Sequence, residues 1–380
     1  MRPRMFVRLR AETLESRDTP VTVGAPGFSA PLATSGPANG IVLVFPPVFS
    51  TGQFNPTTPT AVAPFGAIPQ QIRTAFGDVN GDGIADLIAV TGPGGPTRAV
   101  VLNGSNLTIP LTPVFDPFGD PTFFGGGFVA SGNIEGIARP ADIVFTPDQG
   151  GGPRVVTYSL PAVAFNPPGT TLTPQLRQNF FAFNDPLFRG GARPAVGDLN
   201  ADGFADVTIA AGFLGGPRVA IYNGSTYFLF VGEPAKLISN DFFAFEGADS
   251  ETLRNGVFVA SGDIDGDGFA DLVFGGGPGG GPRVLVLSGR LLTTAGVAAA
   301  QAAPIANFFA GDPNTRGGVR VAAKPIGIGT KAEVVTGSGE NLFSDVRVFL
   351  GASATPIVQP TSFQEINPYN QVLPGGVYVG

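Results

Sequence analysis

The fold is decided by three copies of one stretch of sequence: GDVNGDGIADLIAVTGPGGPTRAVVLNG (residues 77–104), GDLNADGFADVTIAAGFLGGPRVAIYNG (197–224) and GDIDGDGFADLVFGGGPGGGPRVLVLSG (262–289). Each copy has an acidic loop, an apolar strand, a Gly-rich turn, a second apolar strand and an Asn-Gly or Ser-Gly turn. Two further copies, residues 131–158 and 321–350, keep this order but have a degenerate acidic loop. Self-similarity of this kind indicates a repeat architecture.

The arginine after the Gly-rich turn sets the period of the repeat. It recurs as Arg98, Arg154, Arg218, Arg283 and Arg347, at intervals of 56, 64, 65 and 64 residues. A unit of about 60 residues with four short strands has the size of a β-propeller blade. In one unit, apolar runs bounded by Gly, Pro, Asn or Asp predict the four strands Val257–Gly262, Asp271–Gly275, Arg283–Leu287 and Ile305–Phe309.

The two ends of the chain predict how the ring closes. Residues 375–380 match the first strand of a blade, and the segment from Val21–Gly24 through Ile41–Phe45 matches the second and third strands of a blade without its first. Joined, they make one blade, and closing the ring removes exposed sheet edges. The sequence therefore predicts an all-β protein: a six-bladed β-propeller of four-stranded antiparallel blades, closed by the C-terminal strand.

The predicted organisation is a basic leader over residues 1–20 and one propeller domain over residues 21–380. The expected blades span residues 21–60 plus 374–380, 61–118, 119–184, 185–246, 247–311 and 312–373. The leader contains Arg2, Arg4, Arg8 and Arg10, but its apolar stretch is too short for a secretory signal. It resembles the segment ahead of large surface and secreted repeat proteins in some bacteria, and the alternative is a disordered leader or a frayed helix.

Composition supports this fold and excludes several functions. The 380 residues include 56 Gly and 37 Pro, which disfavour long helices, yet 43% are hydrophobic and 33 are Phe, which can form a core. The absence of Cys and His excludes disulfides, thiolate or imidazole catalysis and zinc ribbons, and leaves oxygen ligands suited to calcium or magnesium. The net charge of −7 argues against nucleic acid as a partner. No apolar run is long enough for a transmembrane segment.

The three acidic loops are candidate metal sites of the form Asp-x-Asn/Asp-x-Asp-Gly-x-x-Asp. Oxygens at positions 1, 3 and 5, the carbonyl at position 7 and the carboxylate at position 9 would surround a hard cation, and Gly83, Gly203 and Gly268 at position 6 would allow the turn. Position 12 is Ala89, Ile209 or Phe274, which excludes the bidentate Glu of an EF-hand. The candidate metal ligands are Asp78, Asn80, Asp82, Ile84, Asp86; Asp198, Asn200, Asp202, Phe204, Asp206; and Asp263, Asp265, Asp267, Phe269, Asp271.

These loops and their spacing resemble the FG-GAP and VCBS repeats of integrin-alpha-like propellers, over nearly all of residues 21–380. The resemblance implies calcium in the loops and a role in adhesion, lectin-like binding or other surface interactions. Two units depart from the pattern, since Arg139 lies in the loop of residues 131–158, and Lys324 and Lys331 are interpreted as replacing acids in another. Three calcium sites of structural type are therefore expected. The alternative is that the acidic loops are solvated turns.

The functional prediction is a calcium-binding interaction or adhesion module for a protein or carbohydrate, extracellular or at the cell surface, and monomeric. No catalytic residue is predicted, because the acids outside the loops, such as Glu233, Glu246, Asp249, Glu251 and Glu340, form no repeated constellation. The alternatives are a polysaccharide-acting hydrolase or lyase, which would need two carboxylates converging in the channel, and an architectural component of the cell envelope. The recurring Phe clusters are interpreted as packing between blades. The periodic arginines either fix their turns or bind an anionic glycan near the channel.

Overall fold

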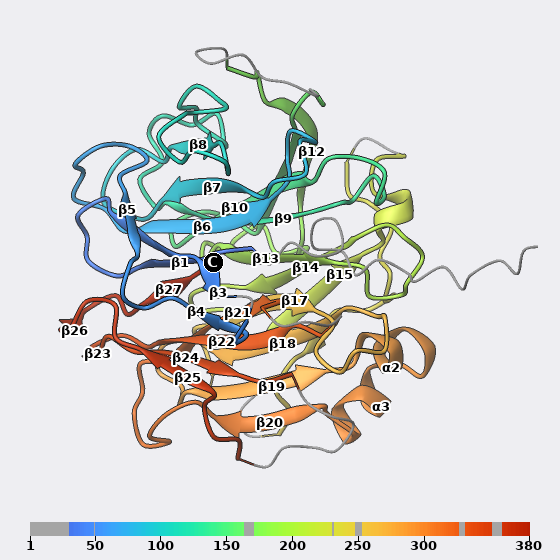
Figure 1. Ribbon diagram of the computed structural model, residues 1–380. Coiled ribbons are helices and arrows are strands. Elements are labelled where there is room, and N and C mark those ends of the chain that lie inside the picture. The colour runs from blue at the N-terminus through green and yellow to red at the C-terminus, as the bar shows by residue number, and fades with distance from the viewer. Residues whose placement is uncertain are drawn as a thin grey trace, which may run out of the picture.

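The computed structural model describes residues 30–48, 50–162, 171–229, 232–247, 253–326, 331–351 and 359–380. Within these ranges the chain forms six antiparallel sheets arranged around a central channel, seen from the side in Figure 1. The all-β, six-bladed propeller is confirmed. The basic leader and the segment Val21–Gly24 lie outside the described residues, as do Asp249 and Glu251.

Each blade is ordered from the channel outward. The hydrogen-bonded sheets are β27 (Tyr378–Val379), β1 (Leu32–Ser35), β2 (Val42–Phe45), β5 (Thr60–Val62); β6 (Ile72–Gly77), β7 (Asp86–Thr91), β8 (Ala99–Leu102); β9 (Gly127–Gly132), β10 (Asp142–Pro147), β11 (Arg154–Ser159), β12 (Gln175–Phe181); β13 (Ala192–Gly197), β14 (Asp206–Ala211), β15 (Arg218–Tyr222), β16 (Phe242–Phe243); β17 (Val257–Gly262), β18 (Asp271–Gly276), β19 (Arg283–Leu287), β20 (Ala306–Phe309); and β21 (Val319–Lys324), β22 (Glu333–Ser338), β24 (Val346–Phe349), β25 (Gln364–Ile366).

Two small irregularities distinguish the blades. In the sheet of β6, β7 and β8, the bridges Ala99–Phe115 and Leu102–Pro110 stand where the other sheets have a fourth strand. Short helices η1 (Gly224–Thr226), α2 (Gly289–Thr294) and α3 (Val297–Ala302) follow third strands, and the ribbons β3 (Pro47–Val48) with β4 (Gln53–Phe54) and β23 (Leu342–Phe343) with β26 (Val372–Leu373) lie outside the blades.

The ring closes as predicted, by pairing of the first and last described strands. β27 lies antiparallel to β1, with Thr34 opposite Val379 and Ser35 opposite Tyr378. Ala33 and Gly380 also exchange two backbone hydrogen bonds of 3.0 Å. The second strand of this composite blade is therefore Leu32–Ser35.

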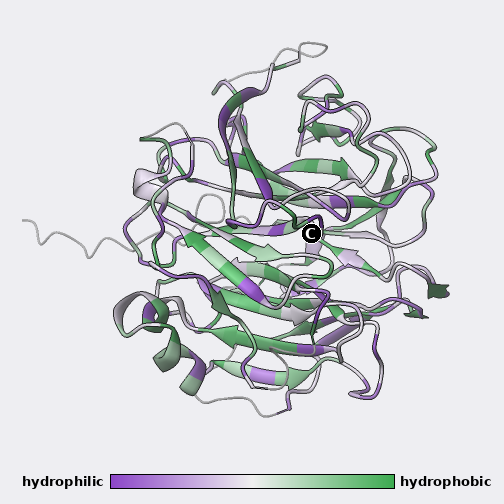
Figure 2. Ribbon diagram, turned by 180° about the vertical axis from the view of Figure 1, so that it is seen from behind, coloured by the Kyte–Doolittle hydropathy of each residue, from purple (hydrophilic) through white to green (hydrophobic). Residues whose placement is uncertain are grey.

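Apolar side chains between neighbouring blades form the core. Every residue of β7, β10, β14 and β18 is buried, because each of these second strands is covered on both faces. Figure 2 shows hydrophobic residues along most of the strands. The Phe clusters follow the predicted packing only in part: Phe180 and Phe183 are buried against the next blade, whereas Phe181 is 60% exposed on the outer strand.

Six side chains near the starts of the inner strands fill one end of the channel. Around the ring they alternate between arginine and an aromatic residue, and we call them the arginine–aromatic plug: Arg73, Phe128, Arg193, Phe258, Arg320 and Tyr378. Each guanidinium carbon lies 3.9–5.7 Å from the centroids of two of the rings. The three rings contact one another with centroids 6.0–6.2 Å apart. These cation–π contacts tie β27 to the blades on both sides of it.

Candidate metal loops and channel

All three predicted acidic loops join the first strand of a blade to the second. In each, the position-9 acid is the first residue of the second strand and lies opposite the last residue of the first, as Asp86 does opposite Gly77. Helix α2 begins at Gly289, whose backbone N–H donates to Asp271, so the acidic loops lie on the side of the ring where Figure 1 shows α2.

Backbone hydrogen bonds to acidic side chains shape these loops. The position-1 carboxylate of Asp263 accepts the N–H groups of Gly266, Asp267 and Gly268 at 2.6–3.1 Å. Asp78 accepts the corresponding three in its loop, and Asp198 accepts two. The position-6 glycines have φ between +85° and +88°, a conformation that non-glycine residues rarely adopt. The loops therefore hold a defined turn.

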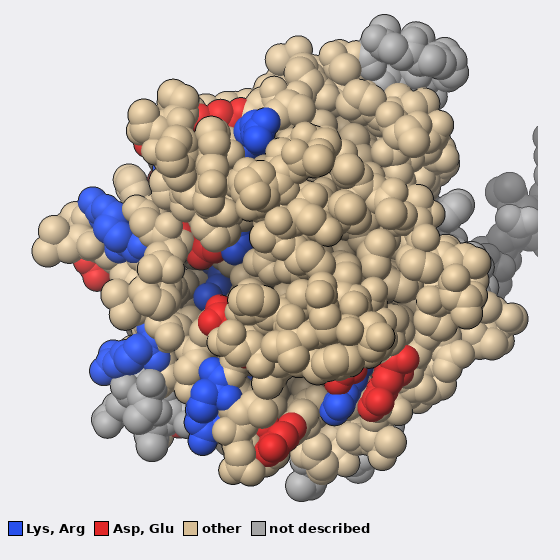
Figure 3. Space-filling model, turned by 90° about the vertical axis from the view of Figure 1, so that its left-hand side faces the viewer, with Lys and Arg blue, Asp and Glu red and all other residues tan. Residues whose placement is uncertain are grey.

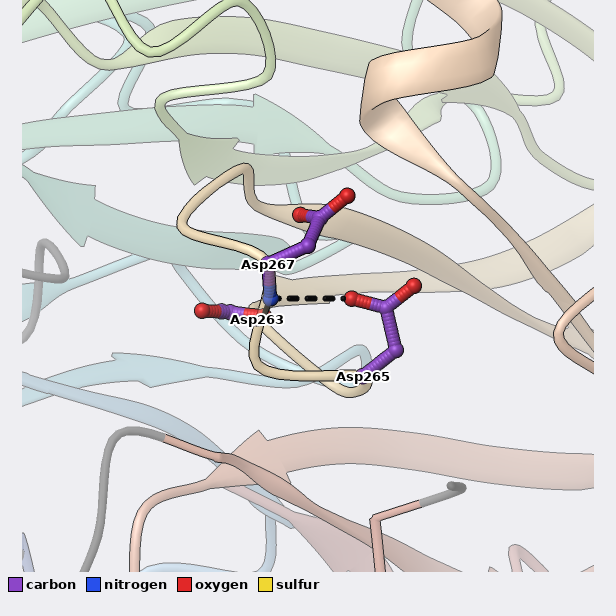
Figure 4. Close-up of side chains that lie close together, drawn as sticks. All are labelled: Asp263, Asp265 and Asp267. Atoms are coloured by element: carbon purple, nitrogen blue, oxygen red, sulfur yellow. Dashed lines mark hydrogen bonds between the residues drawn. The ribbon is translucent and has the colours of Figure 1, made fainter. Parts of the chain in front are cut away.

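The third loop brings three acids together. One carboxylate oxygen from each of Asp263, Asp265 and Asp267 lies within 4.8 Å of the others, and Figure 4 shows their side chains around the loop. Asp265 also accepts the backbone N–H of Asp267 at 3.1 Å. Burial and the neighbouring Asp267 carboxylate both raise the pKa of Asp265. Three crowded carboxylate oxygens form a donor set that suits a hard divalent cation such as calcium.

The other two loops have an asparagine at position 3. The Asn80 amide nitrogen donates to Asp82 at 3.0 Å, and Asn200 donates to Asp202 in the same way. Of positions 1, 3 and 5, only positions 1 and 5 are then acidic in these two loops, whereas all three are acidic in the third loop. At position 7 the side chains of Ile84 and Phe204 are partly exposed, and a coordinating role for their carbonyls, and for that of Phe269, stays a prediction.

The position-9 acids serve the fold directly. Asp86, Asp206 and Asp271 are fully buried, and each accepts the same two backbone N–H groups; Asp271 also accepts that of Asp265 at 3.4 Å. One donor is the residue at loop position 2, and the other is the glycine that follows the third strand; the distances are 2.8–3.3 Å. The carboxylate therefore joins the loop to the far end of the third strand.

The same acid is present in the two units without an acidic loop. Asp142 lies opposite Gly132, and Glu333 lies opposite Lys324 and accepts the N–H of Ile326. Lys324 therefore stands at the glycine position before the loop, and the interpretation that it replaces an acid is wrong. The sequence does contain a signal for this recurring position: an Ala-Asp or Ala-Glu pair stands at the start of the second strand of five blades, at β7, β10, β14, β18 and β22.

Burial raises the pKa of these acids, to about 7 for Asp86 and Asp142 and to about 8 for Asp206. Asp142 is 1% exposed and lies in a unit without a predicted metal, so its titration reports the effect of burial without a contribution from metal binding. Its carboxyl group is protonated in the native state but ionised in the unfolded state between about pH 4 and 7. Ionisation then favours unfolding, and stability falls as the pH rises through this window.

We therefore expect the pH dependence of stability to weaken in Asp142→Asn. Relative to this variant, the wild type should lose up to about 1.4 kcal/mol of unfolding free energy per pH unit between pH 4 and 7. Urea denaturation at several pH values in EDTA measures the difference. Parallel curves for the two proteins would contradict the assignment.

None of the periodic arginines lies among the residues that line the channel, and four of them, Arg154, Arg218, Arg283 and Arg347, contact the preceding blade. Arg154 donates to Asn179 at 2.9 Å and to the Phe118 carbonyl at 2.7 Å, and Arg347 donates to the Ala310 carbonyl of the preceding blade. Arg218 forms a salt bridge with Asp241. These partners lie outside the Gly-rich turns that the arginines were predicted to fix, and they connect neighbouring strands and blades instead.

The channel itself contains basic, aromatic and small side chains. A cavity of about 170 Å³ is lined by the plug and by inner-strand residues that include Phe76, Ser131, Ser261 and Lys324. These lining residues, all of them described, include no Asp or Glu, so the pair of carboxylates that would favour the hydrolase or lyase alternative is not found among them. Glu340 accepts a hydrogen bond from Arg320 at the mouth of the channel, the end at which the inner strands start. Glu233 accepts one from Tyr222 within another blade. No helix in the described parts of the chain is long and apolar enough to cross a membrane.

Comparisons with known proteins give only distant structural matches. No family model matches the sequence, and no curated protein matches it. Among solved structures, the rhamnogalacturonan lyase YesW is similar, with 12% sequence identity and a TM-score of 0.37. The alignment covers 91% of this chain and 64% of the YesW chain. The exotype rhamnogalacturonan lyase YesX has 12% identity and a TM-score of 0.35, with coverage of 94% and 61%. A rhamnogalacturonan lyase from Bacillus licheniformis has 11% identity and a TM-score of 0.34, with coverage of 95% and 74%. Likeness at this level assigns no activity.

Proposed function

We propose that this chain is a calcium-binding β-propeller that acts as an interaction module for a protein or carbohydrate outside the cell or at its surface. The observation that carries the proposal is the clustering of Asp263, Asp265 and Asp267 in a loop already shaped by backbone hydrogen bonds. The resemblance of all three loops to the FG-GAP and VCBS repeats supports it. A bound calcium ion would neutralise carboxylates that otherwise repel one another.

The bound ions would act on the loops, and the ligand would bind elsewhere. The Asp263 side chain is 1% exposed and accepts three backbone N–H groups, so little of it is available to a partner molecule. In this proposal calcium rigidifies the blade connections at one end of the inner strands. The exposed turns and outer strands then present a stable surface.

Calcium titration of the metal-free protein tests the proposal. We expect a heat of binding with about three sites, together with a rise in melting temperature. A site filled at a hundredfold excess over its Kd adds about 2.7 kcal/mol of apparent stability. Asp263→Ala should lose one site, and Asp78→Ala and Asp198→Ala should do the same.

A matched control is available in the degenerate loop. Asn133→Ala changes the unit in which no metal is predicted, so the number of calcium sites should stay the same. If calcium gives neither heat nor a thermal shift, the acidic loops are turns and the calcium part of the proposal fails. Glycan and protein binding screens with and without calcium then test the interaction role.

A further inference from the structure

The end of the channel opposite to the acidic loops carries buried positive charge. Arg73, Arg193 and Arg320 lie near the starts of their strands, whereas the loops begin after the strand ends, roughly 16 Å away at 3.3 Å per residue. Their exposed fractions are 4%, 6% and 2%. Taking a guanidinium group out of water is costly unless it is paired.

Carboxylate partners are too few for these three arginines. Asp148 lies 2.7 Å from Arg73, and Glu340 lies 3.4 Å from Arg320 but is 38% exposed. Among the described residues no carboxylate comes within salt-bridge distance of Arg193, whose polar contact is the Asn255 carbonyl at 3.2 Å. Burial is the main cause that lowers the pKa of Arg193, to about 10; Asp148 and Tyr378 oppose this shift, and Arg320 and Arg73 add to it.

Several donor groups of the arginines also lack an acceptor. The Nε atoms of Arg73, Arg193 and Arg320 are buried without a hydrogen-bond partner, as is Nη1 of Arg73. The rings of the plug offset part of the charge, and among them only the Tyr378 hydroxyl accepts a hydrogen bond, from Nη2 of Arg73 at 3.3 Å. We propose that the mouth of the channel binds a carboxylate group of a ligand, held by the three arginines of the plug.

The turns around the mouth supply little negative charge of their own. Asp148 directly follows a second strand, and at the same position the other blades have Gly36, Gly92, Gly212, Gly277 and Gly339. A Cβ atom at Gly92 would lie 2.8 Å from Nη1 of Arg73, so a side chain there would crowd the guanidinium. One blade thus supplies its own carboxylate, whereas the glycines add no charge and pack closely against backbone: a Cβ atom at Gly212, Gly277 or Gly339 would lie 2.2–2.3 Å from a carbonyl oxygen.

The mouth is also accessible from outside. Figure 3 views this face of the molecule and shows basic and acidic side chains at the floor of a hollow. The cavity of about 170 Å³ lies on the inner side of the plug, because its lining runs from the three arginines to the ends of the inner strands. A charged acceptor in the hollow would form strong, short hydrogen bonds with guanidinium groups.

The test is calorimetric unfolding in EDTA, so that its outcome is independent of calcium and of the proposed function. Melting temperature is followed against sodium glucuronate, sodium acetate, sodium sulfate and glucose, at one ionic strength maintained with chloride. We expect saturable stabilisation by glucuronate and acetate and none by glucose. If glucuronate and acetate stabilise the protein equally, the site recognises the carboxylate alone. If glucuronate stabilises it more, the site also contacts the sugar ring.

Two variants locate the site. Arg193→Met keeps the bulk of the side chain and removes its charge, and it should weaken the affinity for glucuronate at least tenfold while leaving the ligand-free protein as stable or more stable. Arg154→Met, at a periodic arginine between blades, should bind as the wild type does. The proposal is overturned if neither carboxylate stabilises the wild type, if sulfate alone does so, or if Arg193→Met responds equally. The wild-type titration decides the question even if the variant does not fold.

Discussion

Phe258→Ala is expected to lower the free energy of unfolding by about 4 kcal/mol, because it removes a buried ring at the centre of the channel. The ring is 6% exposed and lies 3.9 Å from the guanidinium carbon of Arg193 and 4.9 Å from that of Arg320. It also contacts the other two aromatic residues of the plug. Alanine would leave a cavity and withdraw one aromatic contact from each of two buried cations.

Two controls separate packing from the cation–π contribution. Phe258→Leu retains most of the volume and should cost about half as much. Phe181→Ala removes a ring that is 60% exposed on an outer strand, and should change stability by less than about 0.5 kcal/mol. Urea denaturation of the four proteins measures the series. Equal losses for Phe258→Ala and Phe181→Ala would refute the role of the plug in stability.

Asp206→Ala is expected to cost about 3 kcal/mol in EDTA, where no metal contributes. The carboxylate is fully buried and accepts the N–H groups of Leu199 at 3.0 Å and Gly224 at 2.9 Å. Alanine leaves both backbone donors buried without an acceptor, at roughly 1–3 kcal/mol for each. The loop would also lose its connection to the end of the third strand.

The comparison is Asp202→Ala in the same loop. Asp202 is exposed, and its hydrogen bonds are confined to the loop, so the change should cost less than about 1 kcal/mol in EDTA. Denaturation with and without calcium separates the structural from the metal-binding contribution. If Asp206→Ala loses stability only when calcium is present, the position-9 acid is a metal ligand and does not join the loop to the third strand.

Much of the fold could be predicted because its strands and turns depend on residues that are close together in the sequence. The strands predicted at Val257–Gly262 and Arg283–Leu287 match β17 and β19, since apolar runs bounded by Gly and Pro have few other structures available. The number of blades followed from counting repeats and joining the two ends. The acidic loops were placed between first and second strands for the same reason.

The plug could not be predicted from these patterns. Its members come from different blades, about 60 residues apart, and Arg and aromatic residues alternate where a repeat-based alignment looks for one residue type. Nothing in the local sequence of Tyr378 points to Arg73 or Arg320. Only closure of the ring brings these three side chains together.

At the position-9 acid, one feature could be predicted from the sequence and another only from the structure. Its place in the loop was visible in the sequence, but a carboxylate at that spacing suits a metal ligand and a backbone acceptor equally well. Asp142 and Glu333, in units without the metal loop, show that the acid also holds the blade together. The sequence by itself determined the repeat, the strands and the loops, because these depend on neighbours in the chain. The tertiary structure decided which charges are buried and what faces them, because burial depends on packing between blades that are distant in sequence.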